Sequence, residues 1–414
     1  MDRAIGVLAR LALGLVVATS ASPRAAWAQV RVAQVDTSYG CIVCHADKRR
    51  AFVTGVHAER GIRCHDCHGG TPTAFETRSA HTPRFVGHPG KMRTVAICAS
   101  CHADPNRMRQ YGLPAGQLAE LRTSRHGQLL LERGDTAAPT CTDCHDAHTI
   151  LPPVDARSSV YPANIPATCG RCHEDARRMA GYGIPTGQLA EFTSSAHGVA
   201  LFRERNFAAP TCIGCHGSHA ALPPRVVEIA NVCGRCHELV DRAFEAGPHA
   251  APARLGRLPG CIACHSNHGT ERVPPEQLSG LCVRCHAEGS PAAQRAQQVQ
   301  QEIVRVRDEL RAAAAALEEL VRAGEPVTDT RFRYRTAQTY YEQLGLVQHS
   351  LDLERLNDLT RRTASIARDI RAAAETRRER RWEHRLFLIP VWFLALAAVT
   401  VAGFKLADLR RHGE

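Results

Sequence analysis

The sequence predicts a mostly α-helical protein with extensive loops, a C-terminal helical hairpin or bundle, and one transmembrane helix. Three observations lead to this prediction. All 18 cysteines of the 414-residue chain lie between Cys41 and Cys285, in one short motif that recurs. From residue 290 the composition changes to Ala, Gln, Glu and Arg, with apolar residues at helical spacing. Residues 386–404 form an uncharged apolar run long enough to span a bilayer.

The first residues are typical of a secretory signal peptide. Arg3 and Arg10 give a charged start, an apolar run follows, and Ala26-Trp27-Ala28 is a small-x-small cleavage site. We therefore expect residues 1–28 to be removed on export. An uncleaved anchor helix is the alternative, although the apolar stretch is short for a membrane span.

Every cysteine belongs to a Cys-x-x-Cys-His motif, and none is left over. Two thiols three positions apart can bond the two vinyl carbons on one edge of a porphyrin, and the adjoining histidine can then ligate the iron from its proximal side. The sequence therefore predicts nine covalently bound haems c. A disulfide framework would not require a histidine after every second cysteine, and tandem zinc ribbons are the other alternative. The nine motifs are Cys41-Cys44-His45, Cys64-Cys67-His68, Cys98-Cys101-His102, Cys141-Cys144-His145, Cys169-Cys172-His173, Cys212-Cys215-His216, Cys233-Cys236-His237, Cys261-Cys264-His265 and Cys282-Cys285-His286.

The predicted cofactors also explain the composition of the cysteine block. So many haems in so few residues leave no room for an apolar core around each ring. We expect the porphyrins to be the core, stacked together, with short helices and loops wrapped around them as in a multihaem cytochrome c. The formal net charge of +11 is then balanced mostly by haem propionates, so no nucleic-acid partner is expected.

The cysteine block is internally repetitive. Residues 98–148 match 169–219 at a constant offset, and YGLPAGQLAE (111–120) recurs as YGIPTGQLAE (182–191). Each unit has two motifs with an isolated histidine between them. Cys282 begins a ninth motif without a partner. The expected haem domain covers residues 29–289, with repeats near 41–97, 98–168, 169–232 and 233–289.

Histidines outside the motifs are candidates for the second axial ligand of each iron. A second histidine closes the iron site and suits a site that carries electrons. His81 and His88, in a loop containing Gly and Pro, are two candidates. The number of candidates nearly matches the number of motifs, which argues against a large open iron that binds substrate. The candidates at repeat-equivalent positions are His57, His126, His148, His197, His219, His249 and His268.

Residues 290–385 are predicted to form a helical hairpin or coiled-coil stalk. Ser290-Pro291 is a helix-start signal, and Gly324 with Pro326 ends the first helix. The simplest role of this region is to hold the haem domain above a bilayer. The first helix carries an apolar heptad seam of Val299, Ile303, Val306, Leu310, Ala313, Leu317 and Leu320.

Two further helices are expected over about 329–349 and 352–385, and the last of them leads into the membrane span. His349 lies at the end of the second helix. If the hairpin folds back on the haem domain, His349 could lie over the ninth haem, which has no repeat partner. An exposed turn histidine is the alternative.

The apolar run 386–404 predicts a single-pass protein of the cytoplasmic membrane. More arginines precede this run than follow it, which by itself would favour the opposite orientation. A long exported domain translocates regardless of such charges. We therefore expect the haem domain in the periplasm and residues 405–414 in the cytoplasm.

The motif pairs resemble the doubled-CxxCH multihaem cytochromes of the tetrahaem cytochrome superfamily, the cytochrome c3-like family. The resemblance covers about 41–286, and its most specific parts are SRHG (124–127) and SAHG (195–198) ahead of CTDCHDAH and CIGCHGSH. It implies bis-histidine haems in alternating parallel and perpendicular stacks, and a role in bacterial respiration. It also implies that His126 and His197 are distal ligands.

Three functions are compatible with these features. The first is an electron carrier between a membrane oxidoreductase and a periplasmic or outer-membrane cytochrome or reductase. The second is a multihaem oxidoreductase of the nitrite, hydroxylamine or tetrathionate type, which would need an iron with a vacant position. Many relatives mark that iron with a lysine in place of the motif histidine, and no motif here has one. The third is a quinol-oxidising subunit, whose relatives carry their membrane helix at the N-terminus. We expect a carrier rather than an enzyme.

Overall fold

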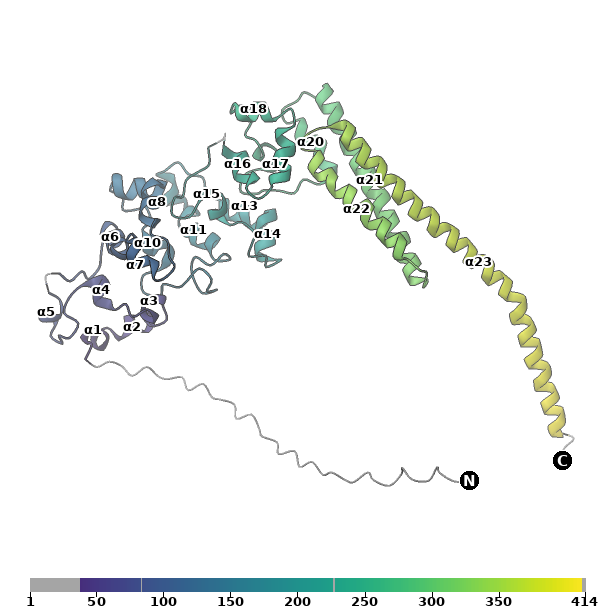
Figure 1. Ribbon diagram of the computed structural model, residues 1–414, viewed down its shortest axis with the longest axis horizontal. Helices are drawn as coiled ribbons and strands as arrows, with labels where there is room; N and C mark the ends of the chain where they lie inside the picture. The colour runs from purple at the N-terminus through teal and green to yellow at the C-terminus, as the bar shows by residue number, and fades with distance from the viewer. Residues whose placement is uncertain (1–37, 83, 226–227, 412–414) are drawn as a thin grey trace, which may run out of the picture. The chain divides into compact units, whose positions relative to one another are not determined.

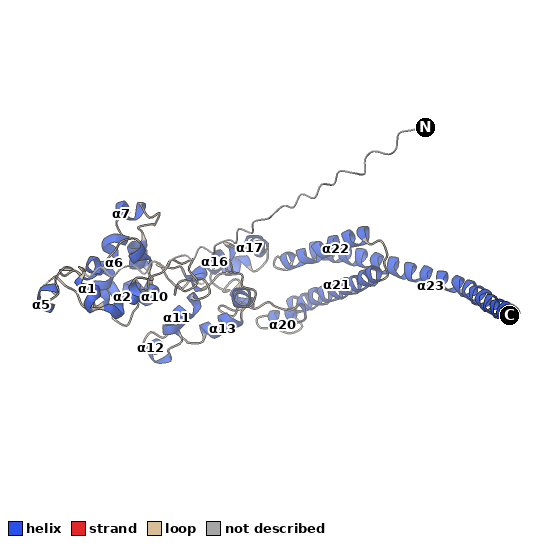
Figure 2. Ribbon diagram, turned by 90° about the horizontal axis from the view of Figure 1, so that it is seen from below, coloured by secondary structure: helices blue, strands red, loops and turns tan. Residues whose placement is uncertain are grey.

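The computed structural model describes residues 38–82, 84–225 and 228–411. These residues form helices joined by turns and loops, and no strand occurs among them (Figures 1 and 2). The prediction of a mostly helical chain is therefore confirmed. The expected signal peptide, residues 1–28, lies outside the described residues.

The chain divides into two compact units. The described part of the first unit consists of residues 38–50, 64–82 and 84–86, and that of the second consists of residues 51–63, 87–225 and 228–411. In the first unit, the backbone N–H of Gly40 donates to the carbonyl oxygen of Pro72 at 2.7 Å. The helices at this end of the chain are α1 (Gly40–Cys44), α2 (Ala46–Phe52), α3 (Val56–Glu59), α4 (Cys64–His68) and α5 (Thr77–Ala80).

In the repeats of the second unit, the two motifs have different local structures. In α6 (Lys91–His102) and α11 (Ile165–His173) the first motif of a repeat lies at the C-terminal end of a longer helix, whereas the second motif forms a short helix of its own. The short helices α16 (Ile229–Gly234) and α20 (Leu278–Cys282) lead into the seventh and ninth motifs and end within them. The helices formed by second motifs are α10 (Cys141–His145), α15 (Cys212–His216) and α19 (Ile262–His265).

Short helices connect these motifs. Most of them have seven residues or fewer, which is too short for a helix to be stable by itself in water. Their stability therefore depends on what they pack against. They are α7 (Pro105–Arg109), α8 (Gln117–Thr123), α9 (Arg125–Gly127), η1 (Gln128–Glu132), α12 (Ala176–Ala180), α13 (Gln188–Ser194), α14 (Ala196–Phe202), α17 (Glu238–Glu245), α18 (Ala250–Arg254) and η3 (Pro275–Gln277).

The cysteine block has little apolar core formed by its own side chains. Among the described residues of 38–289, twelve apolar side chains are buried, against eighteen in the much shorter segment 290–385. Clusters such as Val95, Leu130 and Ala138 are small. A chain of this length without a large side-chain core needs other apolar material to pack around.

Residues 290–385 form a bundle of three helices that run side by side in both views (Figures 1 and 2). They are α21 (Pro291–Arg322), α22 (Thr328–Val347) and the first part of α23 (Leu353–Arg411). The Ser290 hydroxyl accepts a hydrogen bond from the N–H of Ala293, which caps α21 as its sequence predicts. Every residue of the heptad seam is buried. The seam contacts Leu344 and Val347 of α22 and Leu356 and Leu359 of α23.

The turn between α21 and α22 lies against the middle of α23. The Arg377 guanidinium donates to the carbonyl oxygen of Pro326 at 3.2 Å. Arg381 forms ion pairs with Glu319 and Glu325 at 3.7 and 3.9 Å. These contacts hold the turn against α23 at the end of the bundle nearest to the apolar run.

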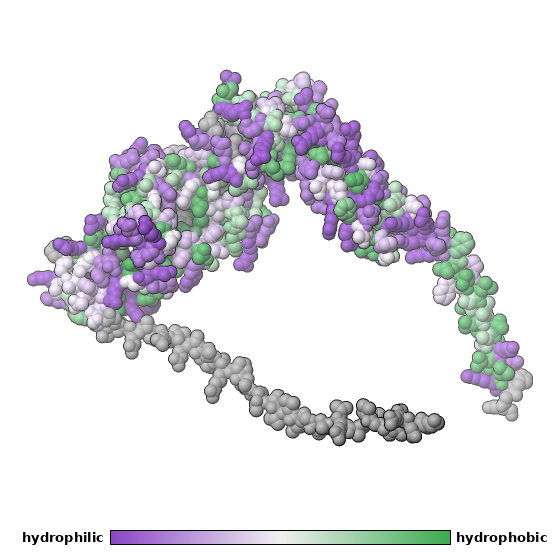
Figure 3. Space-filling view, in the orientation of Figure 1, coloured by the Kyte–Doolittle hydropathy of each residue, from purple (hydrophilic) through white to green (hydrophobic). Residues whose placement is uncertain are grey.

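Helix α23 continues without interruption from the bundle into that run. The helix is long and apolar enough to cross a membrane, and no residue of its most apolar window is buried against the other described residues. Figure 3 shows the hydrophobic surface of this segment. The expected third helix and the expected membrane span are therefore one continuous element, although Pro390 lies within it.

Candidate functional site

Each Cys-x-x-Cys-His motif presents two thiols from about one helical turn. Residues three apart on a helix lie on the same face, so the two sulfur atoms point to the same side. All 18 cysteines are free thiols, and each is partly or largely exposed. The motifs therefore offer paired thiols that are open to a covalent partner.

Eight motif histidines each face one isolated histidine, with ring centroids 6.0–6.2 Å apart. A metal that bonds a nitrogen of each ring at about 2.0–2.1 Å would place the two ring centres roughly 6.3 Å apart. The spacing therefore fits one metal ion held between two imidazoles. The pairs, motif histidine first, are His45–His81, His102–His57, His145–His219, His173–His126, His216–His268, His237–His197, His265–His349 and His286–His249.

Six of the eight pairs cross from one repeat to the next, or to the single ninth motif, in a regular order; His45–His81 lies within the first repeat, and His349 belongs to the three-helix bundle. The isolated histidine between two motifs faces the first motif of the following repeat, as His126 faces His173. The histidine three residues after a second motif faces the second motif of the preceding repeat, as His219 faces His145. Each repeat therefore completes sites in its neighbours, and a metal at these sites would tie adjoining repeats together.

His349 faces His265 of the eighth motif and not the ninth motif, which corrects the expectation from the sequence. His286 of the ninth motif faces His249 instead. The reason is the order of the pairs. A second motif takes its partner histidine from the following repeat, and no repeat follows the one that contains the eighth motif. The three-helix bundle supplies a histidine in its place.

Hydrogen bonds orient several of the motif histidines. In three second motifs the ring Nδ1 lies within hydrogen-bond distance of a backbone carbonyl oxygen. A carbonyl can only accept, so Nδ1 carries the proton and Nε2 keeps the free lone pair that a metal needs. The three contacts are His68 Nδ1 to Val86 O at 2.7 Å, His216 Nδ1 to Leu222 O at 3.2 Å and His265 Nδ1 to Glu271 O at 2.9 Å.

Two of the isolated histidines have a carboxylate oxygen near their ring Nδ1. His219 Nδ1 lies 3.4 Å from Glu120 Oε2, and His268 Nδ1 lies 3.8 Å from Glu191 Oε2. Glu120 and Glu191 end the two repeated QLAE segments. A carboxylate near Nδ1 favours the tautomer whose Nε2 can bind a metal.

Burial keeps many of these imidazoles neutral. Removal from water disfavours the charged form, and this lowers the pKa of each ring. Since a metal binds the neutral imidazole, the surroundings favour the ligating form. The histidines whose pKa is lowered mainly by burial are His57, His102, His126, His145, His173, His197, His249, His268 and His349.

The S-x-H-G segments have a local reason for their composition. Ser124 and Ser195 are buried N-caps, and the hydroxyl of each accepts a hydrogen bond at 2.9 Å from the glycine three residues later. A Cβ on Gly127 or Gly198 would overlap a backbone carbonyl oxygen of the preceding helix. Serine therefore starts the turn and glycine permits the close approach that holds the histidine in place.

His148 lies in the same local arrangement as His219. The N–H of Arg125, just before His126, donates to the carbonyl oxygen of Ala221 at 3.0 Å. The N–H of Val56, just before His57, donates to Ile150 O at 2.8 Å. Ala221 lies two residues after His219, and Ile150 lies two residues after His148. The same backbone contact therefore occurs at both histidines, and His148 keeps its repeat-equivalent position in the fold.

His88 and several other side chains of the cysteine block lie outside the pairs. His88 is exposed, and no imidazole in the described part of the chain faces it at the spacing of the pairs. His65 packs edge-on against Tyr39, and its Nδ1 lies 3.0 Å from the tyrosine hydroxyl. Met108 and Met179 are buried packing residues of α7 and α12.

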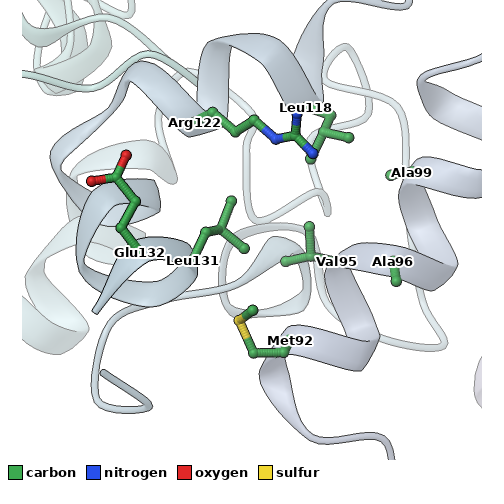
Figure 4. A pocket seen from close by; sticks show the side chains of 8 residues that line it. All are labelled: Met92, Val95, Ala96, Ala99, Leu118, Arg122, Leu131 and Glu132. Carbon is green, nitrogen blue, oxygen red and sulfur yellow. The ribbon is translucent and has the colours of Figure 1, made fainter. Parts of the chain in front are cut away.

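A separate hollow of about 430 Å³ lies beside α6. Figure 4 shows its apolar side chains, among them Val95 and Leu118, with Arg122 and Glu132 beside them. No motif cysteine and no histidine lines it. The hollow is therefore distinct from the paired histidines.

Comparison of the chain with protein-family models, curated proteins and solved structures found no match. The chemistry of the site is therefore argued from its own residues: paired thiols on one helical turn, beside paired imidazoles spaced for one metal.

Proposed function

We propose that this chain is a membrane-anchored c-type cytochrome that carries electrons through nine covalently bound haems. The central support is the set of eight histidine pairs at 6.0–6.2 Å, each beside a pair of free thiols. The haems, when bound, supply one-electron redox chemistry. The chain contributes the thiols for attachment, two imidazoles for each iron and the order of the sites.

The donor set favours haem over zinc. A structural zinc site needs four ligands that converge in a tetrahedron. In residues 38–82, 84–225 and 228–411, no group of three or more His, Cys, Asp or Glu side chains converges in this way. Imidazoles on opposite sides of one metal suit a planar macrocycle that supplies the other ligands. The sparse side-chain core supports the same proposal, because porphyrins would fill the interior.

A carrier is favoured over an oxidoreductase because the axial positions are taken. In each of the eight pairs both imidazoles are in place, and a substrate needs a vacant position on the iron. From its preserved register we assign His148 as a further distal ligand. A nitrite-, hydroxylamine- or tetrathionate-type enzyme would require one of these ligands to leave.

The bundle argues against direct quinol oxidation. The part of α23 from Leu353 to Leu386 is about 50 Å long at roughly 1.5 Å of rise per residue. His349 lies at the far end of this part from the apolar run, so a haem bound there would be far from a quinol in the bilayer. We propose instead that electrons are exchanged in the periplasm, with a membrane oxidoreductase and with a soluble or outer-membrane cytochrome or reductase.

Electron paramagnetic resonance of the oxidised, purified full-length protein tests this function. A carrier with two histidines on every iron should show only low-spin ferric haem, and cyanide or nitrite should leave the spectrum unchanged. A high-spin signal that responds to nitrite would instead favour the oxidoreductase. In the second case the ligand-binding iron would be the active site.

A further inference from the structure

Two arginines join consecutive motifs of adjoining repeats. The Arg171 Nη2 donates to the carbonyl oxygen of Asp143 at 2.7 Å, and the Arg235 Nη2 donates to that of Gly214 at 3.1 Å. Each arginine directly precedes the second cysteine of its own motif. Each acceptor directly precedes the second cysteine of the preceding motif. The same link therefore occurs at two junctions.

This junction differs from the one inside a repeat. Within a repeat, the first cysteines of the two motifs approach each other closely enough to hydrogen-bond, as Cys169 and Cys212 do. Cys98 with Cys141 and Cys233 with Cys261 make the same contact. Between repeats, the second cysteines are brought together through an arginine. From the third motif to the eighth, the sites are therefore joined in sequence order by two alternating contacts.

Each arginine also holds its charge close to the second cysteine of the preceding motif. The carbonyl oxygen that Arg171 or Arg235 contacts belongs to the residue directly before that cysteine. Arg284 has the same position in the ninth motif, directly before its second cysteine.

We propose that Arg171 and Arg235 are positioning residues that fix the junction between haem-bearing motifs of adjoining repeats and hold a permanent positive charge there. This inference rests on the proposed function. A guanidinium stays protonated at all relevant pH values, and its planar donors suit a fixed carbonyl. A positive charge favours the form of a nearby haem that holds the extra electron, so the arginines raise the reduction potentials at the junctions.

A redox titration of the full-length, haem-loaded protein tests this proposal. Arg171→Gln should shift the reduction equilibrium of the nearest haems toward the oxidised form by up to about tenfold, which corresponds to about 59 mV for one electron. Arg235→Gln should give a separate shift, and the double variant should show both. The matched control is Arg177→Gln, because Arg177 is an exposed arginine of α12 and its loss changes the net charge equally. The control should leave the curve unchanged.

Arg171→Lys separates charge from geometry. Lysine keeps the charge but loses the planar fork, so the titration curve should lie closer to wild type than to Arg171→Gln. The proposal is overturned if the two glutamine variants match Arg177→Gln. It is also overturned if Arg171→Lys shifts as far as Arg171→Gln.

Covalent haem content, measured on every variant, separates this inference from the proposed function. A wild-type protein without haem would refute the function itself. Equal haem content with coinciding curves would refute only the role of the arginines. Loss of haem from both glutamine variants would make the residues purely structural and would contradict the effect on potential.

Discussion

His349 lies in a part of the chain that has no cysteine, yet it faces a second-motif histidine, His265. Elsewhere that partner comes from the following repeat. Its ring lies 6.1 Å from that of His265, close to parallel with it, as in the pairs His145–His219 and His216–His268. At the scale of the residue, the ligand set is therefore decided by position in the fold and not by distance along the chain.

Replacement of His349 by alanine should open one iron. We expect His349→Ala to convert about one haem in nine from low-spin to high-spin, because no other ligand holds that axial position. Electron paramagnetic resonance of the oxidised protein would measure the change. The matched control, His384→Ala, removes an exposed histidine of α23 and should keep every haem low-spin. An unchanged spectrum for His349→Ala would show that this imidazole is not a ligand.

Sequence reasoning could find the candidate ligands but not their partners. The constant offset between repeats identifies His126 and His197 as equivalent, because sequence register survives folding. The offset cannot reveal that each of these histidines faces a motif histidine of the adjoining repeat, since that depends on how the repeats pack. For the same reason the sequence places His349 near the ninth motif, whereas in the fold it faces the eighth, and it gives no sign that His88 is exposed.

The helices of the bundle were much easier to predict than those of the cysteine block. A heptad seam reports a buried face directly, and its members, from Val299 to Leu320, are all buried. The expected starts of the three helices and the expected ends of the first two lie within a few residues of those observed. Ser290 and Gly324 mark the two ends of the first helix chemically. The short helices of the repeats carry no such pattern, since side chains form little of the core around them.

Removal of two methyl groups from the bundle core should destabilise the element. Val306 is fully buried in α21, so Val306→Ala should lower the free energy of unfolding of the bundle by about 2 kcal/mol. Urea unfolding followed by circular dichroism would measure this change. Val321→Ala makes the same substitution on the same helix at a side chain that is 46% exposed, and it should cost much less. Equal losses for the two variants would contradict the observed packing.

At the scale of the whole molecule, one helix joins the ligand-bearing bundle to the apolar run. The most apolar window of α23 is not buried against any described part of the chain, as is expected of a helix that faces a bilayer. The tip of the bundle is fixed to α23 through Arg377 and Arg381, only a few residues before the apolar run begins. In the proposed function, the bundle is therefore a stiff spacer as well as a ligand donor.

Truncation should separate anchoring from cofactor binding. A chain that ends after Arg385 loses the apolar run but keeps the bundle and His349. We expect it to move from the membrane fraction to the soluble fraction while its haem content stays the same, as measured by absorbance of the separated fractions. Retention of the truncated chain in the membrane would show that another surface provides the anchor.

The most direct test of the account is the mass of the intact, exported full-length protein, compared with that of the same chain with every motif cysteine replaced by serine. We predict that the wild-type mass exceeds that of the polypeptide by nine haems and that the serine variant carries none. A colourless wild-type chain with the mass of the polypeptide alone would contradict the account, as would one whose thiols hold zinc or form disulfides.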